Sequence, residues 1–403
     1  MTAGRRRRVV LCEPWWRGSH RAWAEGWSIH SRHDVSVVAV EPGSWRWRLR
    51  AGAAPLADAV ARHVERAGPP ETLVVSGLVD VAQLLGLLRG RLPAAVPVVV
   101  MQHESQLIHP TPDGSRDDEA ALRNWLSWRA ADAVWWNSVF HRDEVLAALP
   151  GWLRSIPDHD RGGDAERLTA DLHRRSTVVH LGVQAPDTAV PTETALPTDT
   201  PLATDAPLPV ATPPAVASGP PVVLWPHRWE WDKDPDAFAA ALRRLVADGV
   251  EFRVVLAGEE PTLGVSTRAA VAAELGDRVA AVGPLDADTY RRWLTQSDLV
   301  VSCARHEFFG VGVAEAMAHG AWPVVPDALA YPEVVPDLAT GGRYRPGHFG
   351  TALRRALEHP PTLQQRQALA AAVSQRFAWP RAAETLDAEI DRVVGDLAPP
   401  DPA

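Results

Sequence analysis

The sequence predicts an α/β protein of two domains, each built on a parallel β-sheet. Its 403 residues, 46% of them hydrophobic, are enough for two well-packed domains. Both halves contain short apolar runs without polar alternation, separated by helical patterns, which is typical of parallel strands covered on both faces. Residues 185–221 are almost entirely Ala, Pro, Thr, Val, Leu and Asp, a composition typical of an extended linker.

Residues 1–184 form the first predicted domain. The arginines Arg5–Arg8 mimic the charged start of a signal peptide, but the apolar run behind them stops at Glu13, so we interpret it as a first strand. The predicted strands are Val9–Cys12, Val35–Val40, Thr72–Ser76, Val96–Gln102, Ala133–Asn137 and Thr177–His180.

Residues 222–376 form the second predicted domain. Its predicted strands are Val222–Trp225, Arg253–Ala257, Val279–Val282, Leu299–Cys303 and Trp322–Val325. Its helical patterns include Pro235–Asp248, Asp288–Gln296, Val311–His319 and Phe349–Glu358. A last helix in residues 377–396, near Arg381–Val394, could pack back on the first domain. Two Rossmann-like domains follow, and ligands are expected at the carboxyl ends of their strands, in a cleft between them.

Composition excludes some classes of protein. No apolar stretch approaches the ~20 residues that a membrane span needs, and the two cysteines, Cys12 and Cys303, lie in apolar runs. A disulfide framework or metal cluster is therefore not expected, and we expect a cytoplasmic protein. The net charge of −9 is uneven, because residues 1–184 hold 23 arginines against 21 acidic residues while the remainder holds 18 basic against 29 acidic residues. A polyanionic partner should meet the first half.

All but one of the 41 basic residues are arginine, and the exception is Lys233. It follows the strand Val222–Trp225 by a few residues, close to Arg228. An ammonium and a guanidinium are not interchangeable at a phosphate, so this lysine is a candidate anion ligand. The alternative is a lysine left by chance on a solvated loop.

The segment His306–Gly320 carries the strongest chemical pattern. Glu307 lies in the loop after the strand Leu299–Cys303, and the amides of Phe309, Gly310 and Val311 open a helix whose start can bind diphosphate oxygens. Glu315 lies about two turns further along this helix. Two carboxylates on either side of that anion could hold sugar and ribose hydroxyls.

The chain resembles GT-B glycosyltransferases of the retaining family-4 type, and more closely the tRNA-queuosine α-mannosyltransferase family. The first resemblance rests on Glu-x7-Glu, Arg228, Lys233 and the paired Rossmann-like domains. The second rests on Glu13–Val35 (EPWWRGSHRAWAEGWSIHSRHDV), Met101–Leu107 (MQHESQL), Trp136–Pro150 (WNSVFHRDEVLAALP), Leu224–Phe238 (LWPHRWEWDKDPDAF) and His306–Pro336. It spans nearly the whole chain except the linker and the segment around Ile156–Arg175.

The resemblance implies roles for individual residues. Arg228 and Lys233 would neutralise the donor diphosphate, with backbone donors from the Phe309–Val311 segment. Glu307 would bind the transferred sugar and Glu315 the ribose. His103, at the end of the strand Val96–Gln102, would face the sugar, although a satisfied core histidine is the alternative. Gly18 would approach the donor phosphate or acceptor, and Ser19 and His20 would lie toward the acceptor.

The chain has 17 tryptophans, more than its Tyr and Phe together. Trp23 and Trp27 have helical spacing, which favours a core position. Trp45, Arg46, Arg48 and Arg50 interleave aromatic faces with cations, a combination suited to nucleic-acid bases and phosphates. We therefore assign this segment to the acceptor surface.

The expected activity is retaining transfer of mannose from GDP-mannose to the queuosine of tRNA. A bound metal or other cofactor is not expected, because cationic side chains can replace the metal. One alternative is transfer to a lipid head group or a small metabolite. Another is a non-catalytic sensor of nucleotide sugars.

Overall fold

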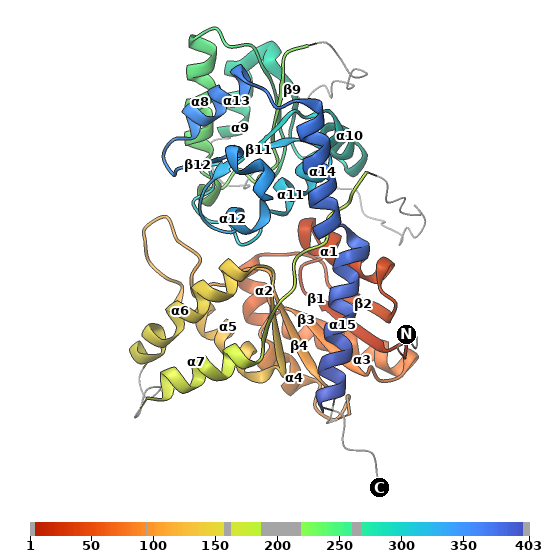
Figure 1. Cartoon of the computed structure of the whole chain (residues 1–403). Helices are drawn as coiled ribbons and strands as arrows, with labels where there is room; N and C mark the ends of the chain where they lie inside the picture. Colours follow the sequence, from red (N-terminus) through yellow and green to blue (C-terminus); the bar gives the residue numbers. More distant parts are fainter. Residues whose placement is uncertain (1–4, 94–95, 157–162, 187–218, 260–266, 398–403) are drawn as a thin grey trace. The chain divides into compact units, whose positions relative to one another are not determined.

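A computed structural model describes residues 5–93, 96–156, 163–186, 219–259 and 267–397. The chain divides into two compact units, which Figure 1 shows coloured along the sequence. Unit 1 comprises Met1–Gly182 together with Arg376–Ala403, and unit 2 comprises Val183–Gln375. Most of the predicted linker, residues 187–218, lies outside the described residues. The two units are therefore described one at a time.

Unit 1 is built on a six-stranded, fully parallel sheet with the order β2-β1-β3-β4-β5-β6. The strands are β1 (Arg8–Glu13), β2 (Asp34–Ala39), β3 (Thr72–Ser76), β4 (Val98–Gln102), β5 (Ala133–Trp136) and β6 (Ser176–Val178). The helices are α1 (Gly18–His30), α2 (Trp45–Ala51), α3 (Ala53–Ala67), α4 (Val81–Leu87), α5 (Asp118–Ala130), α6 (Val139–Ser155), α7 (Asp164–Arg174) and α15 (Trp379–Leu397). Every residue of β3, β4 and β5 is buried, as expected for strands covered on both faces.

Helix α15 belongs to unit 1 although it lies at the end of the chain, and Figure 1 shows it in dark blue. The buried Asp387 attaches it to α1, because its carboxylate accepts hydrogen bonds from Trp27 Nε1 at 2.9 Å and Ser31 Oγ at 2.6 Å. The Trp379 indole occupies the space above Gly26 and Gly182, where any side chain would overlap it. Gly26 and Gly182 thus leave room for the Trp379 ring, and the Asp387 carboxylate bonds α15 to the residues of and after α1.

Unit 2 is built on a second six-stranded parallel sheet, with the order β12-β11-β10-β7-β8-β9. The strands are β7 (Val222–Trp225), β8 (Arg253–Leu256), β9 (Val279–Val282), β10 (Leu299–Val301), β11 (Trp322–Pro326) and β12 (Arg343–Tyr344). The helices are α8 (Pro235–Ala247), α9 (Thr267–Leu275), α10 (Ala287–Gln296), α11 (Val311–Ala318), α12 (Tyr331–Val334), α13 (Phe349–Glu358) and α14 (Leu363–Phe377), with 3₁₀ turns η1 (Trp231–Lys233), η2 (Gly276–Arg278) and η3 (Asp337–Gly342).

Local sequence explains where several helices begin. Asp117, Ser138 and Asp286 each accept a hydrogen bond from a backbone N–H in the first turn of α5, α6 and α10. Asp234 does the same for α8, with Pro235 in the first turn. Such caps satisfy amides that have no partner within the helix.

The predicted α/β class with two Rossmann-like parallel sheets is confirmed, and each predicted strand is present with ends shifted by no more than two residues. The short edge strand β12 was not predicted. Cys12 and Cys303 are both buried and free, as expected. Trp23 and Trp27 are core residues, 2% and 0% exposed. Among the described residues, none of the helices combines the length and apolarity needed to cross a membrane.

Candidate functional site

The candidate site of unit 2 lies where the strand order of its sheet reverses. The strands β7 and β10 are neighbours, but the chain continues from β7 to β8 on one side and from β10 to β11 on the other. The loops that leave the carboxyl ends of these two strands therefore separate, which is the usual ligand position in open α/β sheets. Lys233 follows β7 and Glu307 follows β10, so this topology brings the two predicted residues together.

Lys233 lies at the centre of this site and is 11% exposed at its side chain. Its Nζ atom lies 2.9 Å from the Asp232 carboxylate, 3.2 Å from Glu307 Oε2 and 2.9 Å from the His306 carbonyl oxygen. An ammonium has three protons to donate, and each has an acceptor here. The lone lysine therefore joins the loop after β7 to the loop after β10.

Asp232 was not among the predicted site residues. Its carbonyl oxygen accepts the backbone N–H of Arg305 at 2.8 Å, while its carboxylate faces Lys233. The Arg305 guanidinium pairs with Asp234 at 3.0 Å, next to these contacts. These bonds hold the loop before Glu307 against η1. No sequence signal distinguished Asp232 from other loop aspartates, because its importance depends on the contact between two distant loops.

The charged forms of Lys233 and Glu307 stabilise each other, and Asp232 adds a second negative charge beside Lys233. Burial disfavours the ammonium, but the carboxylates of Glu307 and Asp232 outweigh it and raise the pKa of Lys233 above its usual value. Burial likewise disfavours an ionised Glu307, yet Lys233 and His227 lower the pKa of Glu307 below its usual value. Both groups are therefore charged at neutral pH, and Glu307 is held as a hydrogen-bond acceptor.

His227 lies beside this cluster as a neutral group. Burial lowers the pKa of His227 to about 4, although Glu307 acts in the opposite direction. Its Nε2 atom is buried and has no hydrogen-bond partner among the described residues. The sequence did not single it out, since a histidine after a strand is more often a core residue.

Gly310 places the start of α11 against the site. Its φ of 83° lies in the left-handed region that favours glycine, and a side chain there would overlap the Tyr331 ring. The hydroxyl of Tyr331 donates to Ser302 Oγ at 2.7 Å, which anchors the wall behind the glycine. The first amides of α11, from Val311 onward, have no acceptor within the helix and can bind an anion.

Glu315 lies on α11, two turns beyond Glu307 as predicted. Burial raises the pKa of Glu315 to about 7. In contrast to Glu307, it therefore has no cation that compensates for burial. A carboxyl group whose pKa is raised by burial in this way is typical of a functional site.

Arg228 differs from Lys233 in being accessible. Its side chain is 52% exposed and its guanidinium lies 3.2 Å from the Glu230 carboxylate. A surface pair of this kind is weak and exchanges readily for a better anion. Arg228 is thus much more exposed than Lys233, the other predicted cation of this site.

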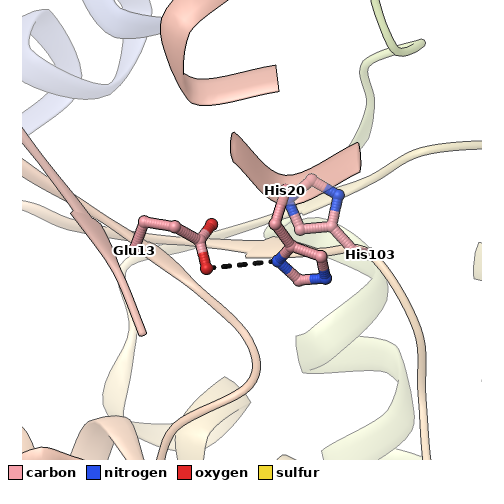
Figure 2. Close-up of side chains that lie close together, drawn as sticks. All are labelled: Glu13, His20 and His103. Atoms are coloured by element: carbon pink, nitrogen blue, oxygen red, sulfur yellow. Dashed lines mark hydrogen bonds and ion pairs between the residues drawn. The ribbon is translucent and has the colours of Figure 1, made fainter. Parts of the chain in front are cut away.

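A second cluster of polar side chains lies at the carboxyl ends of β1, β3 and β4 in unit 1. Glu13 is the last residue of β1, Ser76 the last of β3, and His103 follows β4 directly. His20, in the first turns of α1, reaches this group from above the sheet. Figure 2 shows Glu13, His20 and His103 close together, with Glu13 Oε1 3.2 Å from His20 Nδ1. The predicted histidines are therefore neighbours.

His103 is held among aromatic rings and not in solvent. Its ring centre lies 4.4 Å from that of His20 and 4.9 Å from that of Trp23. Burial lowers the pKa of His103 well below its usual value, and His20 and His141 lower it further. Its Nε2 atom is buried without a hydrogen-bond partner among the described residues. His103 therefore differs from a satisfied core histidine in this one nitrogen, and its contact with the sugar stays a prediction.

Gly18 and Ser19 begin α1 beside this cluster. Gly18 has a φ of 53°, and no atom lies within 4 Å of the position that a side chain would take. The space next to the backbone is open, as the approach of a ligand requires.

Glu13, His20 and His103 offer atoms that lie within 4.8 Å of one another, which is the spacing of a possible metal site. The Nδ1 atom of His20, however, already faces Glu13 and lies 3.2 Å from Ser76 Oγ. The donor set is compatible with a transition metal, but the contacts within it already satisfy part of its bonding capacity. The expectation that no metal is required stays a prediction.

The predicted acceptor segment forms helix α2. Its tryptophan Trp47 is 66% exposed, and Arg46 stacks on Trp45 at 4.7 Å. Arg50 pairs with Glu119 at 2.6 Å, and Arg48 donates to the Glu41 carbonyl oxygen. The segment is at the surface as predicted, but its cations are already engaged with the protein, so it is a weaker anion site than its charge suggested.

The structure thus groups the predicted residues into two sets, one in each unit. Unit 2 brings Arg228, Lys233 and Glu307 together beside the start of α11, and it holds Phe309, Gly310, Val311 and Glu315 at or along that helix. Unit 1 brings together Gly18, Ser19, His20 and His103, with Trp45, Arg46, Arg48 and Arg50 on α2.

Comparison with known families agrees with this division. Residues 8–183 match the family described as tRNA-queuosine alpha-mannosyltransferase N-terminal, and residues 212–374 match glycosyl transferases group 1. A curated relative from Drosophila melanogaster, a tRNA-queuosine alpha-mannosyltransferase, is 29% identical over 331 residues, which is 81% of each chain.

Solved structures share the fold at low sequence identity. Sucrose-phosphate synthase from Thermosynechococcus elongatus is 15% identical with a TM-score of 0.68, over 97% of this chain and 100% of that one. HepE from Anabaena, solved with UDP and glucose, is 17% identical with a TM-score of 0.58, over 96% of this chain and 100% of that one. These likenesses establish the GT-B fold and not a substrate.

The fold, the residues around Lys233 and Glu307, and the two family matches lead to one conclusion. The chain is a GT-B glycosyltransferase in which a domain that matches the tRNA-queuosine alpha-mannosyltransferase N-terminal family is followed by a group 1 glycosyltransferase domain.

Proposed function

We propose that this glycosyltransferase moves mannose from GDP-mannose to the queuosine nucleoside of tRNA, with retention of the anomeric configuration. The observation that carries the donor half is the buried ion pair between Lys233 and Glu307 beside the start of α11. The acceptor half is supported by the match of residues 8–183 and by the name of the relative from Drosophila melanogaster.

The donor would lie at the β7–β10 switch point, with its diphosphate at the start of α11. We assign the direct contacts with the diphosphate to the exposed guanidinium of Arg228 and to the backbone donors of Phe309, Gly310 and Val311. Lys233 contributes its charge from a buried position. Its three protein acceptors mean that a direct bond to phosphate would have to replace one of them.

Glu307 would bind hydroxyls of the transferred sugar, because Lys233 holds its carboxylate ionised and in place. Glu315 would bind the ribose hydroxyls, which can donate hydrogen bonds to its carboxylate. His103 would contact the sugar from the N-terminal domain through its unpartnered Nε2 atom.

The chemical step places negative charge on the departing diphosphate. Arg228, Lys233 and the α11 amides stabilise that charge as the glycosidic bond breaks, which is where electrostatic catalysis is strongest. The acceptor hydroxyl attacks the anomeric carbon from the same face, giving retention. We propose this front-face route without a covalent sugar–enzyme adduct, without a bound metal, and in the cytoplasm.

The deciding experiment combines the purified protein with isotope-labelled GDP-mannose or UDP-glucose and total tRNA, with or without queuosine. The expected result is one labelled mannose per queuosine nucleoside by mass spectrometry, only with GDP-mannose and only in queuosine-containing tRNA. Label in a lipid extract or a small metabolite would replace the acceptor assignment.

A matched pair of variants checks the donor site. Glu307→Gln should abolish transfer, whereas Glu274→Gln, the same change at an exposed pair with Arg243 in unit 2, should leave it unchanged. If Glu307→Gln retained both donor binding and transfer, the site assignment would be wrong. The linkage is read by NMR of the released nucleoside, where an α-mannoside supports retention.

A further inference from the structure

We propose that Trp231 and Arg305 form a platform on unit 2 on which an unpaired base of the acceptor RNA stacks. This inference rests on the proposed function, because that function supplies an RNA acceptor. It places a contact with the acceptor on the unit that holds the donor site, whereas the sequence pointed only to unit 1 for the acceptor. The two side chains together are called the Trp231–Arg305 platform.

Trp231 is the outward-facing residue of the short turn η1. The two residues that follow it in the turn, Asp232 and Lys233, are 5% and 9% exposed, whereas Trp231 is 37% exposed. The turn thus buries its two charged residues and leaves its one apolar residue in contact with water, which is the reverse of the usual partition. Hydrophobic stabilisation is forgone at this ring, and a ligand that covers the ring would recover it.

Arg305 supports the indole and is itself held in place. Its guanidinium carbon lies 5.1 Å from the centre of the Trp231 ring, within the range of a cation–π contact. The same guanidinium forms two bonds with the Asp234 carboxylate, from Nε to Oδ2 and from Nη2 to Oδ1, both at 3.0 Å. Asp234 also caps helix α8, so its carboxylate is fixed. The platform is therefore preorganised, and a base that stacks on it orders few side chains.

The platform adjoins the sugar end of the donor site. Trp231 precedes Lys233 by two residues, and Arg305 precedes Glu307 by two. In the proposed function, Glu307 binds the transferred sugar, and Glu315, two turns further along α11, binds the ribose. The nucleobase of the donor extends beyond the ribose, away from Glu307. A base that stacks beside the sugar end therefore comes from the acceptor.

The chemistry of the platform suits an RNA base. An indole and a guanidinium both stack on the flat faces of bases, and the Arg305 side chain, 46% exposed, also complements the charge of a neighbouring phosphate. Proteins recognise RNA mostly in unpaired segments, where bases are free to stack on side chains. Such stacking tolerates any base, so the platform contributes affinity for the acceptor without selecting its sequence.

Two substitutions at Trp231 test the stack. Trp231→Leu removes the ring and keeps an apolar side chain, and it should raise the Kd and the KM for queuosine-containing tRNA roughly 5- to 150-fold, the range for loss of one base–aromatic stack. Trp231→Phe keeps a ring and should recover most of this loss. The KM for GDP-mannose should stay unchanged in both variants. Leu338→Ala, at another exposed apolar residue of unit 2, is the control and should leave all these values unchanged.

Arg305→Gln tests the second side chain, and it keeps the test decisive if Trp231→Leu is unstable. The affinity for tRNA should fall, while the affinity for GDP should not change. Arg243→Gln breaks a surface pair of the same kind, with Glu274, and should change neither affinity. The double variant of Trp231→Leu and Arg305→Gln should lose less than the product of the two single losses, because both side chains contact the same base.

The salt dependence of tRNA binding separates stacking from a general effect of charge. Loss of a stack weakens binding by the same factor at low and at high salt, whereas loss of a phosphate contact makes binding less sensitive to salt. Trp231→Leu should therefore leave the salt dependence unchanged. Ultraviolet crosslinking followed by mass spectrometry should attach a tRNA nucleotide to the peptide that contains Trp231.

Three results would overturn the platform. The first is a folded Trp231→Leu protein with normal affinity for tRNA. The second is weaker binding of GDP by that variant, since the ring would then stack on the donor base. The third is weaker binding of GDP-mannose with normal binding of GDP, since the ring would then contact the transferred sugar.

Failure of the platform is distinguishable from failure of the proposed function, because tRNA binding is measured without turnover. A wild-type protein that binds tRNA and transfers no mannose refutes the function, and the tRNA affinity of Trp231→Leu still decides on the platform. A wild-type protein that binds no tRNA refutes both. A wild-type protein that transfers mannose, with a Trp231→Leu variant of normal tRNA affinity, refutes the platform alone.

Discussion

Replacing Lys233 with arginine is the change that most directly tests the donor site. The charge is kept, and 40 arginines elsewhere in the chain show that this protein generally accepts that side chain. At this position, however, Nζ donates to Asp232, Glu307 and the His306 carbonyl at 2.9, 3.2 and 2.9 Å. A planar guanidinium cannot point its donors at three acceptors grouped around a single atom.

The expected loss follows from these contacts. A hydrogen bond to a charged group contributes about 1.5–3 kcal/mol, and at least one of the three would be lost in the variant. Because about 1.4 kcal/mol corresponds to a tenfold change in rate, loss of one such bond from the catalytic geometry lowers kcat/KM roughly 10- to 150-fold. Displacement of Glu307 would add to this loss, since Lys233 holds its carboxylate.

Steady-state transfer to queuosine-containing tRNA measures the effect, with thermal unfolding recorded in parallel. Arg243→Lys is the control, because it makes the reverse exchange at an exposed ion pair with Glu274 and should change neither quantity measurably. A Lys233→Arg enzyme with near-normal kcat/KM would refute the reasoning. The single lysine at this position would then have no role in transfer.

Three further predictions concern stability. Burial raises the folded-state pKa of Glu315 to about 7 from 4.5, so ionisation of Glu315 destabilises the fold as pH rises between those values. In urea titrations, Glu315→Gln should therefore raise the free energy of unfolding by on the order of 3 kcal/mol at pH 8 and by little at pH 4. The same variant should bind the nucleotide sugar more weakly. Gly26→Ala should destabilise the protein by about 1–3 kcal/mol, because the new methyl group would overlap the Trp379 ring. Gly86→Ala, where nothing lies within 4 Å, should stabilise helix α4 by about 0.5–1 kcal/mol. The two variants should therefore shift the melting temperature in opposite directions, and shifts in the same direction would contradict this account. Asp387→Ala should cost about 2–4 kcal/mol by leaving buried donors unpaired, and an unchanged melting temperature would show that α15 is held by apolar packing alone.

Much of the architecture was predictable because its signals are local. A run such as Val222–Trp225 is apolar throughout, so it reads as a strand buried on both faces wherever it lies. The caps at Asp234 and Asp286 mark helix starts within three residues of themselves. The short strand β12 was missed because Arg343–Tyr344 is too short to carry a pattern.

The candidate site was predictable only in part. Lys233, Glu307 and Glu315 stood out through residue type and position after strands, and a family resemblance gave them roles. Asp232 and Glu13 did not, because an aspartate beside a lysine and a glutamate at a strand end are common in any loop. Asp232 gains its importance from the hydrogen bond that its carbonyl oxygen accepts from the distant Arg305, and Glu13 from its place beside the distant His103.

The sequence alone thus determined which segments are strands and helices, and that polar groups follow the strands of two parallel sheets. The tertiary structure decided the order of those strands, and with it which loops meet. β7 lies beside β10, so Lys233 reaches Glu307, and β1 lies beside β3, so His20 lies between Glu13 and Ser76. Strand order is a non-local property, set by packing of the whole sheet, and no periodicity within a segment encodes it.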